Sequence, residues 1–371
     1  MRKILSAVLV VAAGSSAFTF AARPAQAVSG GPPAGLQQAA GQLVADGVPG
    51  VIVMTRRGDQ VSHVVAGLAD KATGQLMQSQ DRFHIGSVTK TFVATVVLQL
   101  AAEGRLSLND SVQKWLPGVI TGPVYHPAQI TIRELLQHTS GLPDYASGSF
   151  LTFQNLAQTW QPLQLVDIAL GLPPVHRVYS NTNYILLGMI IQKVTGQSPI
   201  TEINRRILAP LGLQGTSFPL TSTQIPAPFA HGYYGPLDVT NLVNPSPTWT
   251  AGAMISTVDD LARFYRALLT GRLLPRAQQR ELLTAVRITD SGALFPEHFG
   301  LGIYRIQLPC GTAWGHDGGY PGGFKTYAYT SPDGHRQAVL VYNDFLMSTL
   351  SPVTAFQHDV KKAIEIAFCG D

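Results

Sequence analysis

Hydrophobic and polar positions along the chain predict strands and helices near both ends and mainly helices between them. Residues 36–45 have the spacing of a short helix that ends near Gly47. Residues 51–54 and 61–65 are strand-like runs on either side of the turn Arg57-Gly58-Asp59. The longest apolar stretch of the expected mature chain, residues 88–102, is hydrophobic on nearly every face, which predicts a buried helix.

After this helix the pattern predicts mainly helices and loops, and strands return beyond Gly252. Helical spacing occurs at residues 132–138, 183–194, 257–270, 276–286 and 353–368. Strand-like runs occur at 300–307, 312–316, 324–330 and 338–342, with a hairpin turn at Asp333-Gly334. We therefore expect an α/β unit made of residues 28–104 and 251–371, with a mainly helical insertion, residues 105–250. The cleft between two such lobes is a usual place for a ligand site.

Residues 1–27 have the organisation of a secretory signal peptide. Arg2 and Lys3 precede an uncharged apolar run, and Ala25-Gln26-Ala27 is a small-residue cleavage site. Polar residues and Arg23 interrupt the apolar stretch, which argues against a retained membrane anchor, because a helical span needs ~20 apolar residues. We expect cleavage after Ala27 and a secreted, extracellular protein without a membrane anchor.

Composition excludes several classes of function. Only 13% of residues are charged and 45% are hydrophobic, which argues against a disordered or coiled-coil chain. Without the first 27 residues, 23 basic residues face 22 acidic ones and form no cluster, so we expect no nucleic-acid partner. The chain lacks a His-Glu-x-x-His motif and has only two cysteines, so we expect no metal.

The expected export changes the interpretation of the two cysteines, Cys310 and Cys369. A pair of cysteines in an oxidising compartment usually forms one disulfide. The alternative, a cysteine nucleophile, is disfavoured because Cys369 is third from the end and neither cysteine has a histidine partner nearby in the sequence.

A serine followed three residues later by a lysine occurs twice. On a helix these side chains share one face, and a buried lysine with a lowered pKa can take the proton of a serine hydroxyl. Ser111, with Lys114, lies in a short polar segment, so we interpret it as a helix start with an exposed lysine. Ser87, with Lys90, opens the buried helix and is either a nucleophile at the positive helix end or a plain N-cap.

Two more segments are candidates for chemistry. Tyr179-Ser180-Asn181 is the only Tyr-x-Asn in the chain, and it is either a proton-relay and amide-binding element or an ordinary loop before a helix. His316-Asp317-Gly318-Gly319 lies in a glycine-dense strand end. Glycines there let a substrate approach the backbone closely, or serve only a turn.

Taken in order and separated by 92 and 137 residues, these three elements resemble the serine penicillin-recognising hydrolases. That family includes D-Ala-D-Ala carboxypeptidases, class C β-lactamases and related esterases. The resemblance covers about residues 36–371 and includes the segments 83–90, 135–142, 179–184 and 251–256. It is strongest toward secreted actinomycete carboxypeptidases with histidine in the third motif, and the two cysteines and the Phe-Cys-Gly ending are also similar. The resemblance implies a β-lactamase/transpeptidase-like α/β (α+β) fold, an antiparallel sheet flanked by helices with an inserted all-α subdomain.

The resemblance also implies roles for individual residues. Ser87 would attack the carbonyl and form an acyl-enzyme, while Lys90 and Tyr179 move protons and His316 completes the network. The N–H groups of Ser87 and Gly319 would form the oxyanion hole. Substrate-binding roles are implied for Asn181, Asp317, Gly318, Gly319 and Trp249. Neither a metal nor an organic cofactor is implied.

The third motif departs from the family pattern. Asp317 and Gly319 replace hydroxyl residues that help hold a substrate carboxylate, and the position of an arginine that serves it is Tyr304, beside Arg305. If Asp317 faces the cleft, it repels a carboxylate by ~1 kcal/mol in water and more in a partly dry site. A neutral or cationic substrate is then favoured. If Asp317 points away, Arg305 or Arg177 is available as the cation.

The leading expectation is a monomeric serine hydrolase that acts through an acyl-enzyme on Ser87. It would be a D-Ala-D-Ala carboxypeptidase-like, penicillin-binding enzyme whose substrate is a peptidoglycan-type peptide, a β-lactam or an ester. The alternatives are a β-lactamase, esterase or D-amino-acid amidase on the same scaffold. A more remote alternative is a non-catalytic module that binds β-lactams or peptidoglycan, and the intact set of Ser87, Lys90 and Tyr179 argues against it.

Overall fold

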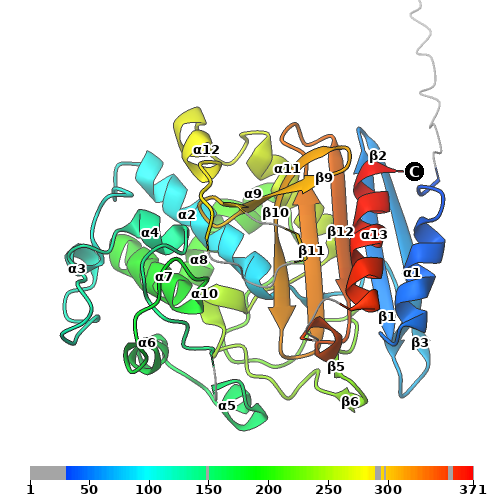
Figure 1. Ribbon diagram of the computed structural model, residues 1–371, viewed down its shortest axis with the longest axis horizontal. Coiled ribbons are helices and arrows are strands. Elements are labelled where there is room, and N and C mark those ends of the chain that lie inside the picture. Colours follow the sequence, from blue (N-terminus) through cyan, green and yellow to red (C-terminus); the bar gives the residue numbers. More distant parts are fainter. Residues whose placement is uncertain (1–30, 148–149, 289–293, 296–297, 350–353, 371) are drawn as a thin grey trace, which may run out of the picture. The chain divides into compact units, whose positions relative to one another are not determined.

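An eight-stranded antiparallel sheet joins the two ends of the chain (Figure 1). The structure is a computed structural model that describes residues 31–147, 150–288, 294–295, 298–349 and 354–370, so the predicted signal peptide lies outside the described residues. The strand order is β3-β2-β1-β12-β11-β10-β9-β8. The strands are β1 Gly50–Arg57, β2 Gln60–Asp70, β3 Gln75–Leu76, β8 His298–Phe299, β9 Tyr304–Leu308, β10 Gly311–Tyr320, β11 Phe324–Thr330 and β12 Arg336–Tyr342.

Each face of this sheet packs against its own set of helices. Helices α1 (Leu36–Ala45) and α13 (Ala355–Cys369) share one apolar cluster with the sheet, while α2 (Thr89–Ala102) and α11 (Val258–Leu269) share the other. Figure 1 shows α13 beside α1, at the end of the sheet where β1 and β2 lie. A disulfide joins Cys310, in the turn after β9, to Cys369 at the end of α13, with 5.5 Å between the Cα atoms. The mixed fold with an antiparallel sheet flanked by helices is therefore confirmed.

The elements between α2 and β7 (Ile255–Ser256) are mainly helices, and residues 31–371 belong to one structural unit. The division into two subdomains stays a prediction. No helix among the described residues is long and apolar enough to cross a bilayer. The helices of this part are α3 Val112–Trp115, α4 Ile132–Leu136, α5 Phe153–Ala157, α6 Pro162–Leu170, α7 Asn181–Thr195, α8 Pro199–Ile203, α9 Ala209–Leu211 and α10 Trp249–Gly252. The short strands are β4 Phe83–His84, which pairs with β7, and β5 Tyr233–Tyr234, which pairs with β6 Leu237–Asp238.

Several predicted boundaries differ from the structure. The helix predicted over 276–286 is wrong beyond Leu282, where α12 (Arg276–Leu282) ends, because Val286 pairs with Phe299 through backbone hydrogen bonds. β10 continues four residues past His316, because its glycine-rich end still pairs with β11. Both differences come from strand pairing, which the hydrophobic pattern of each segment alone does not reveal.

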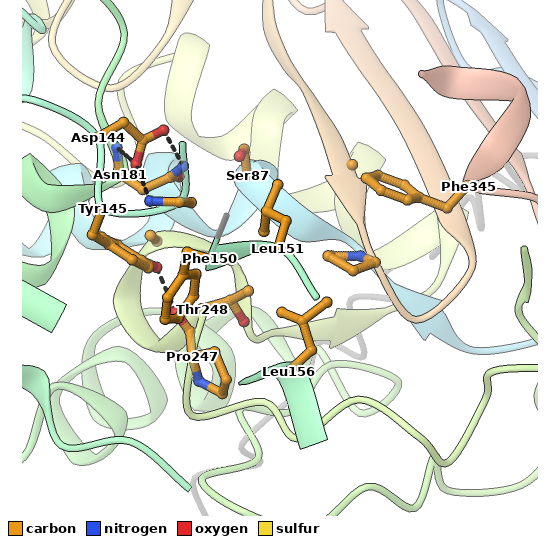
Figure 2. Close-up of a pocket in the computed structure, with 15 residues that line it drawn as sticks. Ser87, Asp144, Tyr145, Phe150, Leu151, Leu156, Asn181, Pro247, Thr248 and Phe345 are labelled. Atoms are coloured by element: carbon orange, nitrogen blue, oxygen red, sulfur yellow. Dashed lines mark hydrogen bonds between the residues drawn. The ribbon is translucent and has the colours of Figure 1, made fainter. Parts of the chain in front are cut away.

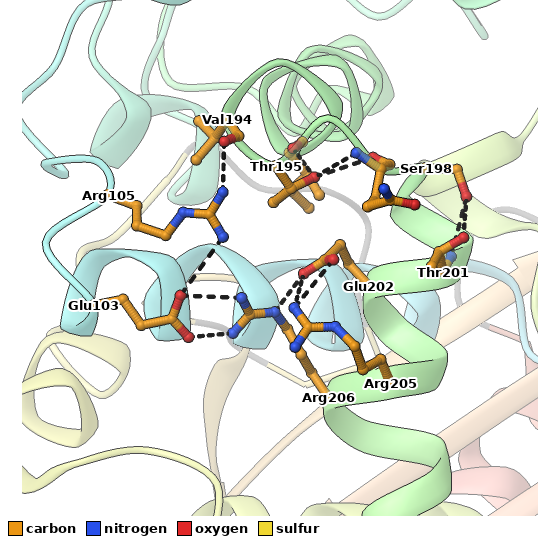
Figure 3. A network of polar contacts seen from close by, with 11 residues as sticks. Glu103, Arg105, Val194, Thr195, Ser198, Thr201, Glu202, Arg205 and Arg206 are labelled. Carbon is orange, nitrogen blue, oxygen red and sulfur yellow. Dashed lines mark hydrogen bonds and ion pairs between the residues drawn. The ribbon is translucent and has the colours of Figure 1, made fainter.

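A partly buried network of charges anchors the far end of α2 (Figure 3). Arg206 donates to Glu103, which follows α2, and to Glu202 of α8, whose carboxylate is buried. Burial acts to raise the pKa of Glu202, but Arg206 and Arg205 lower it below its ordinary value. The helix whose first turn follows Ser87 is thus held at its other end by paired charges.

Candidate active site

Ser87 lies in a single 3-10 turn, Gly86–Val88, that leads directly into α2. Most residues of α2 are buried. Lys90 lies among apolar neighbours and is itself 0% exposed. Lys90 Nζ lies 2.9 Å from Ser87 Oγ. The first Ser-x-x-Lys element therefore brings its two side chains into hydrogen-bond contact.

Two further oxygen atoms surround the Lys90 amine. Asn181 Oδ1 and the Ala251 carbonyl oxygen each lie 2.7 Å from Nζ, and both can only accept hydrogen bonds. A neutral amine can therefore donate its two N–H groups to them and direct its lone pair at the Ser87 hydroxyl. Burial lowers the pKa of Lys90 to about 7, although Asp144 and Asp317 act to raise it. About half of the Lys90 side chains can thus accept a proton at neutral pH.

Asn181, the first residue of α7, links Lys90 to the carboxylate of Asp144. Its Nδ2 donates to Asp144 Oδ2 at 2.9 Å while its Oδ1 accepts from Lys90. Asp144 Oδ1 accepts the backbone N–H groups of Asn181 at 3.2 Å and Ala146 at 3.0 Å. Burial raises the pKa of Asp144, and these N–H donors and Lys90 oppose the rise. Both side chains are therefore fixed in orientation before any substrate binds.

Tyr179 packs beside Lys90 as a neutral phenol. Its ring centroid is 4.9 Å from Lys90 Nζ and 4.2 Å from the ring centroid of His138, which stacks on it. Its hydroxyl oxygen is buried and has no hydrogen-bond partner among the described residues. Burial raises the pKa of Tyr179 well above its ordinary value, against a lowering influence of the Ser87 side chain. Lys90, rather than a Tyr179 phenolate, is therefore the base available to Ser87 at neutral pH.

His316 of β10 presents a hydrogen-bond acceptor to this cluster. Its Nδ1 lies 2.5 Å from the Asp317 carbonyl oxygen, so Nδ1 carries the proton and Nε2 does not. Nε2 is buried without a partner among the described residues, and the His316 and Tyr179 ring centroids are 6.3 Å apart. Burial lowers the pKa of His316 to about 4, so the ring is neutral at pH 7.

Glycines let β10 approach the nucleophile's turn closely. A Cβ on Gly318 would lie 1.9 Å from the Ile85 carbonyl oxygen. A Cβ on Gly86, whose φ is 51°, would lie 2.4 Å from the Gly319 carbonyl oxygen. The backbones of Ser87 and Gly319 consequently border the same cavity, which is the arrangement that the predicted oxyanion hole requires.

Beside Ser87 is a cavity of about 210 Å³ with a mostly apolar wall (Figure 2). Of the predicted site residues, Ser87, Asn181 and Gly319 line it. Asp144 is the one charged side chain among the described residues of the lining. Figure 2 shows Asp144 and Asn181 on one side of Ser87 and Phe345 on the other. The apolar part of the wall includes Tyr145, Phe150, Leu151, Leu156, Pro247, Pro321 and Phe345.

The other predicted residues lie outside the described lining. Lys90 contacts Ser87, Tyr179 packs beside Lys90, and the His316 ring centroid is 6.3 Å from that of Tyr179. Asp317 is turned to Tyr304, whose hydroxyl donates to it at 2.5 Å, and to the Lys325 ammonium. Burial acts to raise the pKa of Asp317, but Lys325 and His316 lower it to about 2.

Trp249 and the two arginines considered as cations also lie away from the cavity lining. Trp249 is 6% exposed at the start of α10, where it packs so closely on Gly188 of α7 that a Cβ there would be 2.9 Å from the indole ring. Arg177 and Arg305 are exposed. The substrate contacts predicted for Trp249, Asp317 and Gly318 stay predictions.

The second Ser-x-x-Lys element is a helix start, as interpreted from its polar surroundings. Ser111 Oγ accepts the backbone N–H of Lys114 at 3.3 Å, and α3 follows. The Lys114 side chain is 56% exposed and pairs with Asp110 at 2.7 Å. Among the described residues, no group of three His, Cys, Asp or Glu side chains could hold a metal ion.

The sequence patterns did not predict site roles for His138, which lies within the segment 135–142, or for Asp144, which follows that segment. His138 Nδ1 accepts the Ser180 N–H at 3.1 Å, so the imidazole supports the residue after Tyr179. The Pro143 carbonyl accepts hydrogen bonds from Ser180 at 3.0 Å and from Thr182 at 2.7 Å. An acidic residue two positions after this segment was the available signal for Asp144.

The Beta-lactamase family profile matches residues 36–355. Penicillin-binding protein 4* of Bacillus subtilis (strain 168) is 28% identical, with 86% of this chain and 72% of the relative covered. Penicillin-binding protein 4 of Amycolatopsis lactamdurans is 28% identical over 72% of this chain and 70% of its own.

Solved structures give the same picture. A D-stereospecific amidohydrolase from Streptomyces sp. has a TM-score of 0.81 and 38% identity, covering 91% of this chain and 99% of its own. The D-amino acid amidase from Ochrobactrum anthropi SV3, complexed with L-phenylalanine amide, has a TM-score of 0.78 and 27% identity, covering 89% and 96%. The chain therefore belongs to the β-lactamase family and is a serine hydrolase of the penicillin-binding-protein type.

Proposed function

We propose that this protein is an amidohydrolase that cleaves amides and esters of D-amino acids with a free amino group and an apolar side chain. The observation that carries the proposal is the Asp144 carboxylate in the cavity wall, beside Asn181 and near Ser87. A substrate ammonium would pair with it, and the surrounding apolar side chains would hold the substrate's own side chain. The D configuration is taken from the similarity to the D-stereospecific amidohydrolase and the D-amino acid amidase.

In the acylation half, Ser87 Oγ attacks the substrate carbonyl carbon while neutral Lys90 takes the hydroxyl proton. The N–H groups of Ser87 and Gly319 stabilise the oxyanion. The Tyr179 phenol passes a proton to the leaving nitrogen and is replenished from Lys90, so the C–N bond breaks and ammonia departs. His316 Nε2, which has no partner among the described residues, is available to accept a hydrogen bond from substrate or water during the reaction.

In the deacylation half, water attacks the Ser87 ester while Lys90 again takes a proton. The ester C–O bond breaks, and Ser87 regains its proton as the D-amino acid leaves. One amide and one water become one carboxylic acid and one ammonia, so the reaction balances without an oxidant or a further reactant.

The test compares D-phenylalaninamide, L-phenylalaninamide and N-acetyl-D-phenylalaninamide, with ammonia release as the measurement. We expect the first to have the highest kcat/KM, because only it offers a D-residue with an ammonium group. Asp144→Asn should lower kcat/KM for it by about 30-fold, the equivalent of about 2 kcal/mol for a lost hydrogen bond to a charged group. Asp167→Asn, on the exposed face of α6, is the matched control and should change nothing.

Equal rates with the acetylated and the free amide would refute recognition of the ammonium by Asp144. Ammonia release by Ser87→Ala at the wild-type rate would refute the acyl-enzyme mechanism. Equal rates for the D- and L-amides would refute the stereochemical part of the proposal.

A D-Ala-D-Ala carboxypeptidase is the second candidate, and the penicillin-binding relatives at 28% identity favour it. Its substrate ends in a free carboxylate, whereas Asp144 is the one charged side chain among the described residues of the cavity lining. Release of D-alanine from an N-acylated peptide that ends in D-Ala-D-Ala, with no ammonia from the amides, would favour this candidate. Hydrolysis of nitrocefin would favour a β-lactamase instead.

We also propose that the enzyme is exported and acts outside the cell as a monomer. The pattern of residues 1–27 and the pairing of Cys310 with Cys369 support export. Mass spectrometry of protein recovered from the culture medium of its host should show a chain that begins at Val28. Recovery of the uncleaved chain in the cell pellet would contradict export.

A further inference from the structure

The wall of the cavity opposite Asp144 is built from β10 and from the segment after β12. Side chains at alternate positions of a strand share a face, so Asp317 and Gly319 face the same way. On this face the Lys325 ammonium and the Tyr304 hydroxyl are both bonded to the Asp317 carboxylate. The charges therefore pair with each other, and neither Asp317 nor Lys325 belongs to the described lining of the cavity.

Phe345 covers the position where Gly319 lacks a side chain. A Cβ on Gly319 would lie 2.9 Å from Phe345 Cε2, so the aromatic ring occupies the space that any larger residue at 319 would use. Both residues line the cavity. The contact is close enough that the ring and the strand backbone form one continuous wall.

The backbone around Phe345 is tied down. The Phe345 N–H donates to the Tyr233 carbonyl at 2.9 Å, and Asp344 Oδ1 accepts the Leu346 N–H at 2.9 Å. These bonds fix the start of the segment that carries the ring, so Phe345 has a fixed position in the cavity wall.

The position of Ser87 indicates which end of the cavity holds the substrate's amino group and which end holds its leaving group. Ser87 lies between Asp144 and Phe345 (Figure 2). In an amino acid amide, the amino group and the leaving group lie on opposite sides of the carbonyl carbon that the serine attacks. An ammonium held at Asp144 therefore directs the leaving group toward Phe345.

We propose that Phe345 is a specificity-determining residue that restricts the leaving group to ammonia or a small alcohol and excludes amino acids with a free carboxylate. The wall offers a leaving carboxylate an aromatic ring and a glycine, with the nearby ammonium of Lys325 already paired to Asp317. A carboxylate there would lose water without gaining a partner, and the ring limits the space for a residue-sized leaving group. This inference rests on the proposed function, because it needs the amino group at Asp144.

Two substrates with the same acyl group test the inference: D-phenylalaninamide and D-phenylalanyl-D-alanine. The quantity measured is the ratio of kcat/KM for the dipeptide to kcat/KM for the amide. We expect a ratio well below one for the wild type and an increase of about tenfold or more in Phe345→Ala, because a pocket wall of this size gives that order of discrimination. Phe345→Leu, which keeps more of the packing, should give a smaller increase in the same direction.

Phe153→Ala is the matched control, because Phe153 is 42% exposed on α5 and is not among the described lining residues. Its ratio should equal that of the wild type. An unchanged or lower ratio in both Phe345 variants, with the amide still hydrolysed, would overturn the inference and leave the proposed function standing. A wild type that prefers the dipeptide would also overturn it. A wild type that hydrolyses neither substrate would refute the proposed function and the inference together.

Discussion

The buried amine of Lys90 should make acylation of Ser87 depend on pH near neutrality. A lysine with the ordinary pKa of 10.5 is neutral in only about one molecule in 3,000 at pH 7. Burial lowers the pKa of Lys90 to about 7, so about half of the molecules have a neutral amine there. The gain in the reactive form is on the order of a thousandfold. This form is the one whose lone pair faces the Ser87 hydroxyl.

The assay is the single-turnover acylation rate with methyl phenylacetate, an ester that has no ionisable group of its own and whose leaving group is a small alcohol. The sign follows from the pKa: Lys90 loses its proton as the pH rises through about 7, so the rate should rise about tenfold from pH 6 to pH 8 and then level off. A rate that is flat over this range, or that rises only above pH 9, would refute Lys90 as the neutral base.

The charge of Asp144 allows a second, independent test of the pKa of Lys90. Its negative charge acts to raise the pKa of Lys90, so Asp144→Asn should move the midpoint of the pH–rate curve to lower pH. Asp167→Asn removes an exposed carboxylate from α6 and should leave the midpoint in place. A midpoint that moves upward in Asp144→Asn would contradict the assigned electrostatics.

Three further predictions concern the scaffold. Arg206→Ala leaves the buried Glu202 carboxylate with only Arg205 and should lower the free energy of unfolding by about 3 kcal/mol, measured by urea denaturation, with activity kept at low temperature. Cys310→Ser opens a loop of 59 residues and should lower the free energy of unfolding by ~4 kcal/mol, an effect that reductant should reproduce in the wild type. Gly318→Ala should abolish the acylation burst, because its Cβ would lie 1.9 Å from the Ile85 carbonyl oxygen and push β10 away from Ser87. A normal burst in this variant would contradict the close approach.

The parts of the site that local sequence determines could be predicted. Lys90 follows Ser87 by three residues at the start of a helix, so their contact depends on helical geometry alone. The apolar run after Lys90 likewise predicts its burial and, from that, its lowered pKa. The second element could be recognised as a helix start because its surroundings are polar, and Lys114 is indeed exposed.

The parts that depend on distant contacts could not be predicted. Asp144 reaches the site only because the loop after α4 packs against the start of α7. Phe345 is far from Ser87 in the sequence and reaches the cavity because β12 lies next to β11, which pairs with β10. The direction of the Asp317 side chain was also open, since it depends on Tyr304 and Lys325 from two neighbouring strands. These residues give the site its proposed specificity. Substrate specificity is therefore the property that depends most on the structure and least on local sequence.

In the proposed reaction Ser87 carries the acyl group of an amino acid with a free amino terminus. Intact-mass measurement after rapid quenching of a reaction with D-phenylalanine methyl ester, whose leaving group is a small alcohol, tests this assignment. We expect a mass increase of one D-phenylalanyl group on the wild type and on Ser111→Ala, the serine of the second Ser-x-x-Lys element, and none on Ser87→Ala. An adduct that persists on Ser87→Ala, or that disappears in Ser111→Ala, would contradict it.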